Sequence, residues 1–376
     1  MHVLIVGGGI GGLTLAAAVA QRGHTVQVLE RSPGATPAGA GLALQPNAMT
    51  VLASLGLVTP VMAEGRAVAR VALFDCDGRL LGPELDMASL SEPFGVPVLA
   101  IHRARLHEVL YAAVGEAVLT HGADVAQVSS SGSVASVRCR DGRTFDADLI
   151  VGADGLRSVI RRHIVDDGEP LYSGYTSWRG VTSAGAGPRL ERMSESWGRG
   201  ERFGMVDIGH DEIYWFAVAN AKPGGVDTSP HVELLQRFAH WHAPIRDVLN
   251  ATSENRIIRT DISDRNPVTR WHKDRVVLLG DAAHAMTPNL GQGACQAIED
   301  AAVLAEELAR PGTVDKALER YERRRVKRVN AVVMQARRLG RLAQLQHPAA
   351  AWCRNTLMRL TPRSATERQV QSLWRI

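Results

Sequence analysis

The stretch RVVLLGDAAHAMTPNLGQGACQAIED, residues 275–300, carries the pattern around which the rest of the chain is organised. Its apolar residues 276–279 predict a buried strand, Gly280-Asp281 a turn, and the residues after Gly293 a helix. An acid at a strand end, glycines that allow close backbone approach, and the unpaired N–H groups of a helix start favour a bound, electron-rich polyol ligand. Because Gly-Asp after an apolar run also occurs in ordinary turns, the remaining motifs must decide between the two interpretations.

The composition is that of a globular protein with room for two domains. The chain has 376 residues, of which 45% are hydrophobic and 22% are charged, so it holds enough apolar material for real cores. Its net charge of +4 comes from basic residues that are scattered along the sequence with few aromatic residues between them. We therefore expect no nucleic acid partner.

Cysteine spacing and hydropathy exclude two further classes of protein. The four cysteines lie far apart, without metal-binding spacing, which predicts no bound metal and reduced thiols in a cytoplasmic protein. The apolar run at residues 3–20 contains five glycines, which argues against a membrane helix. No later segment is long and apolar enough to cross a bilayer, so we expect no membrane span.

Residues 2–30 predict a strand, a glycine-rich turn, a helix and a second strand, the start of a Rossmann-type dinucleotide-binding domain. Gly7 allows the tight turn, Gly9 lets backbone reach a pyrophosphate, and Gly12 lets the helix pack closely on the strand. Glu30, at the end of the second strand, is placed to bind ribose hydroxyls. This motif taken by itself fits both NAD and FAD.

A second strand-to-turn passage contains Gly-Ala-Asp-Gly-x-x-Ser at 152–158. With GxGxxG at 7–12 and Gly-Asp-Ala-Ala-His-x-x-x-Pro-x-x-Gly-Gln-Gly at 280–293, it makes the chain resemble the class A flavoprotein monooxygenases, which have the para-hydroxybenzoate hydroxylase fold. Tyr-Thr-Ser-Trp-Arg-Gly at 175–180 and the helical tail make it most similar to the branch of salicylate hydroxylase, zeaxanthin epoxidase and FAD-dependent urate hydroxylase. The resemblance spans nearly the whole chain and specifies no substrate.

The resemblance implies an α/β fold in which a Rossmann-type FAD-binding domain carries an inserted antiparallel β-sheet substrate domain and C-terminal helices. We expect the FAD-binding domain at residues 1–67, 101–171 and 271–346, the last including a long helix. The substrate domain is expected at 68–100 and 172–270, and a C-terminal helical segment at 347–376. The arginines of the long helix, predicted over 314–346, are expected to be solvated on the face opposite an apolar stripe.

The resemblance also implies which residues hold FAD along its length. The ADP half is expected on Gly7, Gly9, Gly12, Glu30, Arg31, Arg103 and, through its backbone, Val125. The ribityl chain and the flavin ring are expected on Asp281, Gly291, Gln292, Gly293 and Ala294. Asp154 is associated in the family with both FAD and pyridine-nucleotide binding. A solvated side chain is the alternative for Arg103.

Substrate contacts are expected from Arg202 and Tyr214, on paired strands of the substrate domain, and from Pro288 beside the flavin ring. Each of the two strand residues also fits a purely structural role. No catalytic residue is assigned, because His210 is expected in an exposed turn and His284 is expected to position backbone. No second GxGxxG is present, so NADH or NADPH is expected as a transient co-substrate without a domain of its own.

The function implied is that of an FAD-dependent oxidoreductase that consumes NAD(P)H and O2. It would hydroxylate an electron-rich aromatic, heteroaromatic or enolic small molecule through a C4a-hydroperoxyflavin. An epoxidase or heteroatom oxygenase would use the same oxidant. A flavin dehydrogenase and a non-catalytic flavin-bound ligand-binding protein are the remaining alternatives. The sequence leaves the oligomeric state open.

Overall fold

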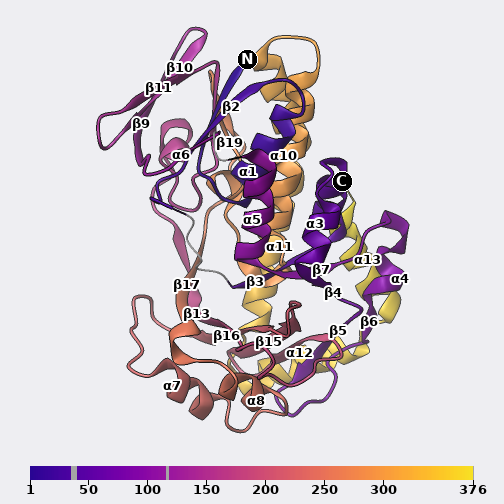
Figure 1. Ribbon diagram of the computed structural model, residues 1–376. Coiled ribbons are helices and arrows are strands. Elements are labelled where there is room, and N and C mark those ends of the chain that lie inside the picture. Colours follow the sequence, from indigo (N-terminus) through magenta and orange to yellow (C-terminus); the bar gives the residue numbers. More distant parts are fainter. Residues whose placement is uncertain (35–39, 116–117, 376) are drawn as a thin grey trace.

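The computed structural model describes residues 1–34, 40–115 and 118–375. A mostly parallel sheet with its helices forms one end of the molecule, and a mostly antiparallel sheet, called the antiparallel sheet below, forms the other (Figure 1). The long helix α11 (Val314–Ala343) runs from one end to the other. The predicted fold class, a Rossmann-type α/β domain joined to an antiparallel sheet and C-terminal helices, is confirmed.

The mostly parallel sheet has the strand order β18-β19-β12-β1-β2-β8. Its strands are β1 (His2–Val6), β2 (Thr25–Leu29), β8 (Leu119–Thr120), β12 (Leu149–Gly152), β18 (His272–Lys273) and β19 (Val276–Leu278). Every neighbouring pair is parallel except β18 with β19. Val3, Leu4 and Ile5 of β1 are all fully buried, as a parallel strand covered on both faces should be.

Helices cover this sheet, and two small sheets flank it. The helix α1 packs against α10 and α5, and α10 also packs against α11 and α2. The helices are α1 (Ile10–Ala20), α2 (Pro46–Ser54), α3 (Val58–Ala63), α5 (Arg103–Val114), α6 (Val159–Ile164) and α10 (Gly293–Ala309). The small sheets comprise β9 (Val125–Ser131), β10 (Val134–Cys139) and β11 (Thr144–Ala147), and β3 (Gly41–Leu44), β4 (Gly65–Ala67) and β7 (Leu99–His102).

The seven-stranded sheet draws on two separate parts of the chain. Its order is β17-β13-β16-β15-β14-β5-β6. The early strands are β5 (Arg70–Asp75) and β6 (Leu85–Asp86), and the later ones are β13 (Leu171–Val181), β14 (Met193–Trp197), β15 (Glu201–Asp207), β16 (Ile213–Asn220) and β17 (Ile258–Asp264). The strands β5 and β14 pair directly and are parallel, whereas the other neighbouring strands of this sheet are antiparallel. The two segments assigned to the substrate domain therefore build a single sheet, with α4 (Met87–Ser91), α7 (Pro230–Arg237) and α8 (Ile245–Asn250) around it.

Individual side chains of the last three helices differ widely in how far they are buried. The expectation that the arginines of α11 are solvated is wrong for Arg325, which is 1% exposed. Trp352 in α12 (Pro348–Leu360) is 68% exposed, whereas Trp374 in α13 (Arg363–Trp374) is 2% exposed.

Among the helices described, none has the length and apolarity needed to cross a membrane. In the same described residues, no group of three or more His, Cys, Asp or Glu side chains is placed to hold a metal ion.

Candidate active site

Three glycine-rich turns predicted from the sequence meet at one edge of the parallel sheet. The strand β1 lies between β2 and β12, and β12 pairs with β19. The turns that follow these strands therefore lie at their carboxyl ends, where open α/β sheets bind ligands. A Cβ on Gly7 would lie 2.3 Å from the Ala153 carbonyl oxygen, so the turns after β1 and β12 touch. The fold thus brings Gly7, Asp154 and Asp281 to one edge.

Glycine occupies the three motif positions of the first turn for different physical reasons. Gly7 has a φ of +111°, which disfavours other residues. A Cβ on Gly12 would lie 2.0 Å from the Gly7 carbonyl oxygen, so α1 starts directly against β1 only because Gly12 has none. Gly9 has an ordinary φ of −76°, and a Cβ there would meet no atom within 4 Å. The fold does not require glycine at this position, but a pyrophosphate at the α1 N-terminus does.

Glu30 lies directly after β2, next to the first turn. Its Oε2 accepts a hydrogen bond of 2.8 Å from the Gly8 N–H, and its Oε1 accepts one of 2.8 Å from the Ser32 N–H. The Ala123 N–H, in the loop that leads into Val125, donates to the main-chain carbonyl oxygen of Glu30 at 2.9 Å, so the start of β9 lies close to the Glu30 backbone. Val125 is buried and Arg31 is exposed. A carboxylate has further lone pairs, which leaves Glu30 able to accept ribose hydroxyls.

Asp281 begins the short helix α9 (Asp281–His284), directly after Gly280. Its side chain is exposed, yet the surrounding protein displaces enough water to raise the pKa of the carboxyl; His284 and Arg103 act in the opposite direction. Exposure together with close protein surroundings places Asp281 in a concave part of the surface. Arg103, the first residue of α5, lies within electrostatic reach of it. A Cβ on Gly293 would lie 4.0 Å from Asp281 Oδ1, so the starts of α5, α9 and α10 converge.

The loop before α10 presents backbone rather than side chains. The 3₁₀ helix η4 (Pro288–Leu290) ends at Gly291, whose φ is +62°. Gln292 is 1% exposed, because its Oε1 accepts from Asn47 Nδ2 at 3.0 Å and its Nε2 donates to Gln45 Oε1 at 2.6 Å. Within the described residues, no side chain caps the first turn of α10. Its first N–H groups are therefore available to a ligand, and the helix start favours negative charge there.

Taken together, these features fit FAD. Open space lies in front of Gly9, an acid follows both β2 and β19, and an uncapped helix start lies beside Asp281. Gly293 and Ala294, the first residues of α10, are half-buried. An elongated dinucleotide can therefore lie along the sheet edge with its flavin end at α10. The individual contacts stay a prediction.

Asp154 makes hydrogen bonds within its own turn. Its carboxylate accepts from Ser158 Oγ at 2.5 Å and from the Val159 N–H at 2.7 Å, which ties it to the start of α6. Burial raises the pKa of Asp154, and these hydrogen bonds oppose the shift. Arg161, fully buried in α6, donates to two backbone carbonyls of α9 at 3.0 and 2.6 Å. The turn after β12 thereby supports the one that carries Asp281.

A buried ionic cluster, which sequence reasoning missed, lies behind this edge. It consists of His284, Glu299, Asp300 and Arg325, each at most 1% exposed. Arg325 Nε donates to Asp300 Oδ1 at 2.7 Å, and Arg325 also pairs with Glu299. Asp300 Oδ2 lies 2.6 Å from His284 Nε2 and accepts from the Gly280 N–H at 3.0 Å. Burial alone would raise the pKa of Asp300, but His284 and Arg325 outweigh it and lower that pKa to about 2.

Arg202, one of the predicted substrate contacts, has protein partners. It lies in β15 and is 3% exposed. Its Nε donates to Gln344 Oε1 at 2.8 Å, its Nη1 to Glu195 Oε1 at 3.1 Å and its Nη2 to Asn289 Oδ1 at 2.9 Å. Arg202 therefore joins the antiparallel sheet to η4 and to the end of α11. A direct substrate contact stays a prediction.

Tyr214 lies in β16 on the side of the sheet that faces β3. A Cβ on Gly41 would lie 2.4 Å from Tyr214 Cγ, so the ring packs directly on the β3 backbone. Burial raises the pKa of the Tyr214 hydroxyl, which keeps it protonated. Pro288 is exposed at the start of η4. Tyr214 also belongs to a group of packed side chains that we call the interdomain apolar cluster.

The interdomain apolar cluster connects the antiparallel sheet, the loop before α10 and α13. Its buried members include Val181, Val206, Val332, Leu373 and Trp374. Its partly buried members include Phe94, Met193, Tyr214, Met286 and Leu290. Met286 and Leu290 flank Pro288 in residues 285–292, the segment between α9 and α10 that we call the flavin loop. Apolar side chains therefore continue from the flavin loop to the antiparallel sheet. The cluster therefore packs against both the loop before α10 and the antiparallel sheet.

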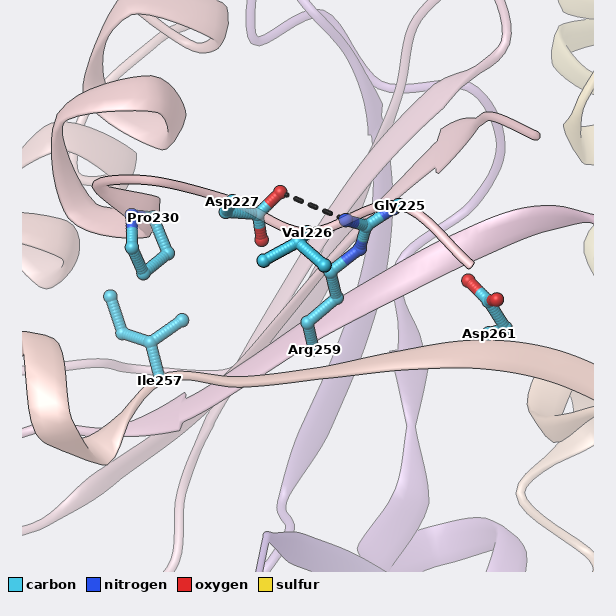
Figure 2. A pocket seen from close by; sticks show the side chains of 7 residues that line it. All are labelled: Gly225, Val226, Asp227, Pro230, Ile257, Arg259 and Asp261. Carbon is cyan, nitrogen blue, oxygen red and sulfur yellow. Dashed lines mark hydrogen bonds and ion pairs between the residues drawn. The ribbon is translucent and has the colours of Figure 1, made fainter. Parts of the chain in front are cut away.

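Two hollows lined by described residues lie away from these side chains. Figure 2 shows one of about 360 Å³ on the antiparallel sheet, where Asp227 and Arg259 pair at 3.2 Å. It is lined by Gly225, Val226, Asp227, Pro230, Ile257, Arg259 and Asp261. The other, of about 730 Å³, lies between β9, β10 and α6. None of the residues expected to bind FAD or substrate lines either hollow, so we assign no cofactor or substrate to them.

Comparison with known proteins gives the same cofactor. The sequence profile of the FAD binding domain family matches residues 1–336. The chain is 46% identical over 361 residues to aurachin C monooxygenase/isomerase of Stigmatella aurantiaca, covering 96% of this chain and 94% of that protein. It is 33% identical to 2-heptyl-3-hydroxy-4(1H)-quinolone synthase of Pseudomonas aeruginosa, covering 100% of this chain and 98% of that protein.

Solved structures agree. The crystal structure of Klebsiella pneumoniae HpxO with FAD and uric acid has a TM-score of 0.93 and 26% sequence identity, covering 100% of this chain and 96% of that one. The predictions of FAD as cofactor, NAD(P)H as co-substrate and monooxygenation as reaction type are confirmed. The chain belongs to the FAD-dependent monooxygenases of the class A, para-hydroxybenzoate hydroxylase-like branch.

Proposed function

We propose that this monooxygenase hydroxylates a heteroaromatic ring of the 4-quinolone type that carries an apolar tail, with O2 as the source of the oxygen atom. The observation that carries this proposal is the interdomain apolar cluster, where Tyr214, Met286 and Leu290 offer aromatic and aliphatic surface beside the flavin loop. Arg202 is engaged with Glu195, which favours an uncharged ligand over a small anion. The name of the 33% identical relative, a heptyl-bearing 3-hydroxyquinolone synthase, supports the same substrate class.

In this proposal the cofactor lies along the sheet edge. Its ADP half lies on Gly7, Gly9, Gly12, Glu30, Arg31, Arg103 and Val125, and its ribityl and ring parts on Asp281, Gly291, Gln292, Gly293 and Ala294. When bound there, FAD would supply electron transfer from NAD(P)H to O2 and transfer of one oxygen atom to the ring. The division into FAD-binding and substrate domains at the expected boundaries belongs to the same proposal.

In this proposal, the protein stabilises negative charge near the flavin, excludes water from the site and fixes the position of the flavin loop. The α10 N-terminus stabilises negative charge on a nearby group by about 0.3–2 kcal/mol. Met286 and Leu290, on either side of Pro288, exclude water from the space between the flavin loop and the antiparallel sheet. Arg202 holds that loop through Asn289 and so fixes its distance from the sheet. Tyr214 packs against the ring of the substrate.

The substrate class is tested with a series of 2-alkyl-4(1H)-quinolones of increasing tail length, with salicylate and uric acid as polar references. NADH and NADPH oxidation and product mass are measured for each compound. Each added CH₂ that is buried contributes about 0.8 kcal/mol, so kcat/KM should rise about fourfold per CH₂ until the apolar space is filled. Turnover of salicylate or uric acid at least as efficient as that of the longest quinolone would contradict the proposal.

A further inference from the structure

Trp374 is the most buried side chain of the last helix, α13. Most of α13 is exposed or half-buried, but Trp374 is 2% exposed. Its ring meets Phe94 edge to face, with ring centroids 5.6 Å apart and planes at 84°. Its indole Nε1 donates to Gln45 Oε1 at 2.8 Å. The ring therefore fills apolar space in the interdomain apolar cluster, while its one polar atom is paired with Gln45, the residue between β3 and α2.

Gln45 joins Trp374 to the flavin loop. Its Oε1 also accepts from Gln292 Nε2 at 2.6 Å, and its Nε2 donates to the Leu290 carbonyl oxygen at 2.9 Å. Its Nε2 would lie 3.3 Å from a Cβ on Gly291, so the amide lies directly against that loop. Because Trp374 can only donate, it fixes which end of the Gln45 amide is the acceptor. That choice in turn fixes the bonds to Leu290 and Gln292.

Two further bonds attach α13 to both halves of the site. Arg328 Nη2 donates to the Leu373 carbonyl oxygen at 3.1 Å, and the same guanidinium pairs with Glu299 of the buried ionic cluster at 3.0 Å. Gln371 Nε2 donates to the carbonyl oxygen of Leu90, a residue of α4, at 3.2 Å. The helix α13 is thus bonded to α11 and to α4, the short helix that follows strand β6 of the antiparallel sheet. A change in the position of α13 would therefore alter its contacts with both helices.

We propose that α13 is a wall of the substrate site, and that Trp374 acts in two ways. Its ring limits the size of the substrate tail, which makes it a specificity-determining residue. Its N–H, acting through Gln45 and Gln292, makes it a positioning residue for the flavin loop. The statement on tail size rests on the proposed function, whereas the statement on the flavin loop rests only on FAD binding.

Four variants separate these roles. Trp374→Phe keeps an aromatic ring and removes the N–H, and Trp374→Ala removes both. Gln45→Met breaks the hydrogen-bonded chain without changing α13. Trp352→Phe, at the 68% exposed tryptophan of the neighbouring helix, is the matched control. FAD dissociation constants are measured by fluorescence titration of the deflavinated protein, together with the share of NAD(P)H electrons recovered as H2O2.

Loss of the single hydrogen bond from Trp374 to Gln45 should raise the FAD dissociation constant about two- to tenfold in Trp374→Phe. Gln45→Met removes all three hydrogen bonds of the Gln45 side chain and should raise the constant at least as much. Both variants should show a larger H2O2 share. In Trp374→Ala, the ratio of kcat/KM for a nonyl over a heptyl quinolone should rise as well. The control should match the parent protein in every measurement. A shift in the H2O2 share at saturating substrate distinguishes loop positioning from a loss of general stability.

FAD affinity and H2O2 share that equal those of the parent in both Trp374→Phe and Gln45→Met would overturn the positioning role. If the ratio of kcat/KM for the nonyl over the heptyl quinolone is unchanged in Trp374→Ala, α13 does not form a wall of the substrate site. If the parent does not turn over any quinolone while FAD binding still weakens in Trp374→Phe and Gln45→Met, the proposed function fails and the positioning role stands. Gln45→Met keeps that role testable even if the tryptophan variants fail to fold.

Discussion

Replacing Gly9 with valine is expected to weaken FAD binding by roughly 10- to 100-fold without destabilising the deflavinated protein. A Cβ at Gly9 meets no protein atom within 4 Å, and the φ of −76° suits any residue, so the fold tolerates the change. The valine side chain would instead occupy the space assigned to the pyrophosphate, and overpacking of this kind costs roughly 1–3 kcal/mol. FAD titration and thermal unfolding of the deflavinated variant measure the two effects separately.

Gly12→Ala is the matched comparison, because its added Cβ would lie 2.0 Å from a backbone oxygen of Gly7. This variant should lose stability before any cofactor is added, since neither backbone can give way without moving α1. Parent-like FAD affinity in Gly9→Val would show that the pyrophosphate lies elsewhere. Equal losses of unfolding temperature in the two variants would show that Gly9 is a packing glycine.

Arg325→Met is expected to destabilise the protein by about 3–5 kcal/mol, because it leaves Glu299 and Asp300 buried without their main cation. Urea unfolding measures this loss directly. Arg323→Met, at an exposed position of the same helix, is the control and should change stability by no more than about 0.5 kcal/mol. An unfolding midpoint for Arg325→Met equal to that of the control would mean that the buried ionic cluster contributes nothing to the fold.

The same cluster has a defined pH dependence. The pKa of Asp300 is lowered from 3.8 to about 2, so its ionised form is favoured in the folded state. Its contribution to stability is therefore complete above pH 3.8 and is lost as the pH falls through about 2. The Asp300 carboxylate also accepts a hydrogen bond from the Gly280 N–H. Protonation of Asp300 should therefore weaken the hydrogen bond that holds the turn carrying Asp281.

The motif glycines were predictable because their requirements are local. A tight turn, a close helix-to-strand contact and an open helix start each depend on residues within a few positions, and the strand pattern places those residues at the sheet edge. Adjacency of the three turns follows once β1, β12 and β19 are neighbours in a parallel sheet. The strand-and-turn pattern therefore predicted three neighbouring turns, and the role of each turn in holding FAD stays a prediction.

The buried ionic cluster was not predictable in the same way. The helix α11 carries arginines along most of its length, and periodicity does not say which of them meets a buried acid. Only the packing of α10 on α11 selects Arg325 for Glu299 and Asp300. The one available signal was the adjacent acidic pair 299–300 within an otherwise apolar helical stretch.

Side-chain partners also separate residues that look alike in sequence. Trp352 and Trp374 both lie on predicted helical segments, yet one is exposed and the other is buried with its N–H paired to Gln45. Arg202 and Asp154 matched family motifs as ligand contacts, and both have protein partners here. Sequence patterns give the position of such a side chain in the fold, but its hydrogen bonds depend on long-range packing.

The most direct test of the whole account is the isotopic composition of the product made under ¹⁸O2 by the FAD-loaded protein. With 2-heptyl-4(1H)-quinolone and NADH or NADPH, the product should gain one ¹⁸O atom for each molecule of reduced nicotinamide consumed in productive turnover. A product that lacks ¹⁸O, or complete recovery of the electrons as H2O2 while the quinolone is bound, would contradict the assignment of this site as a quinolone monooxygenase.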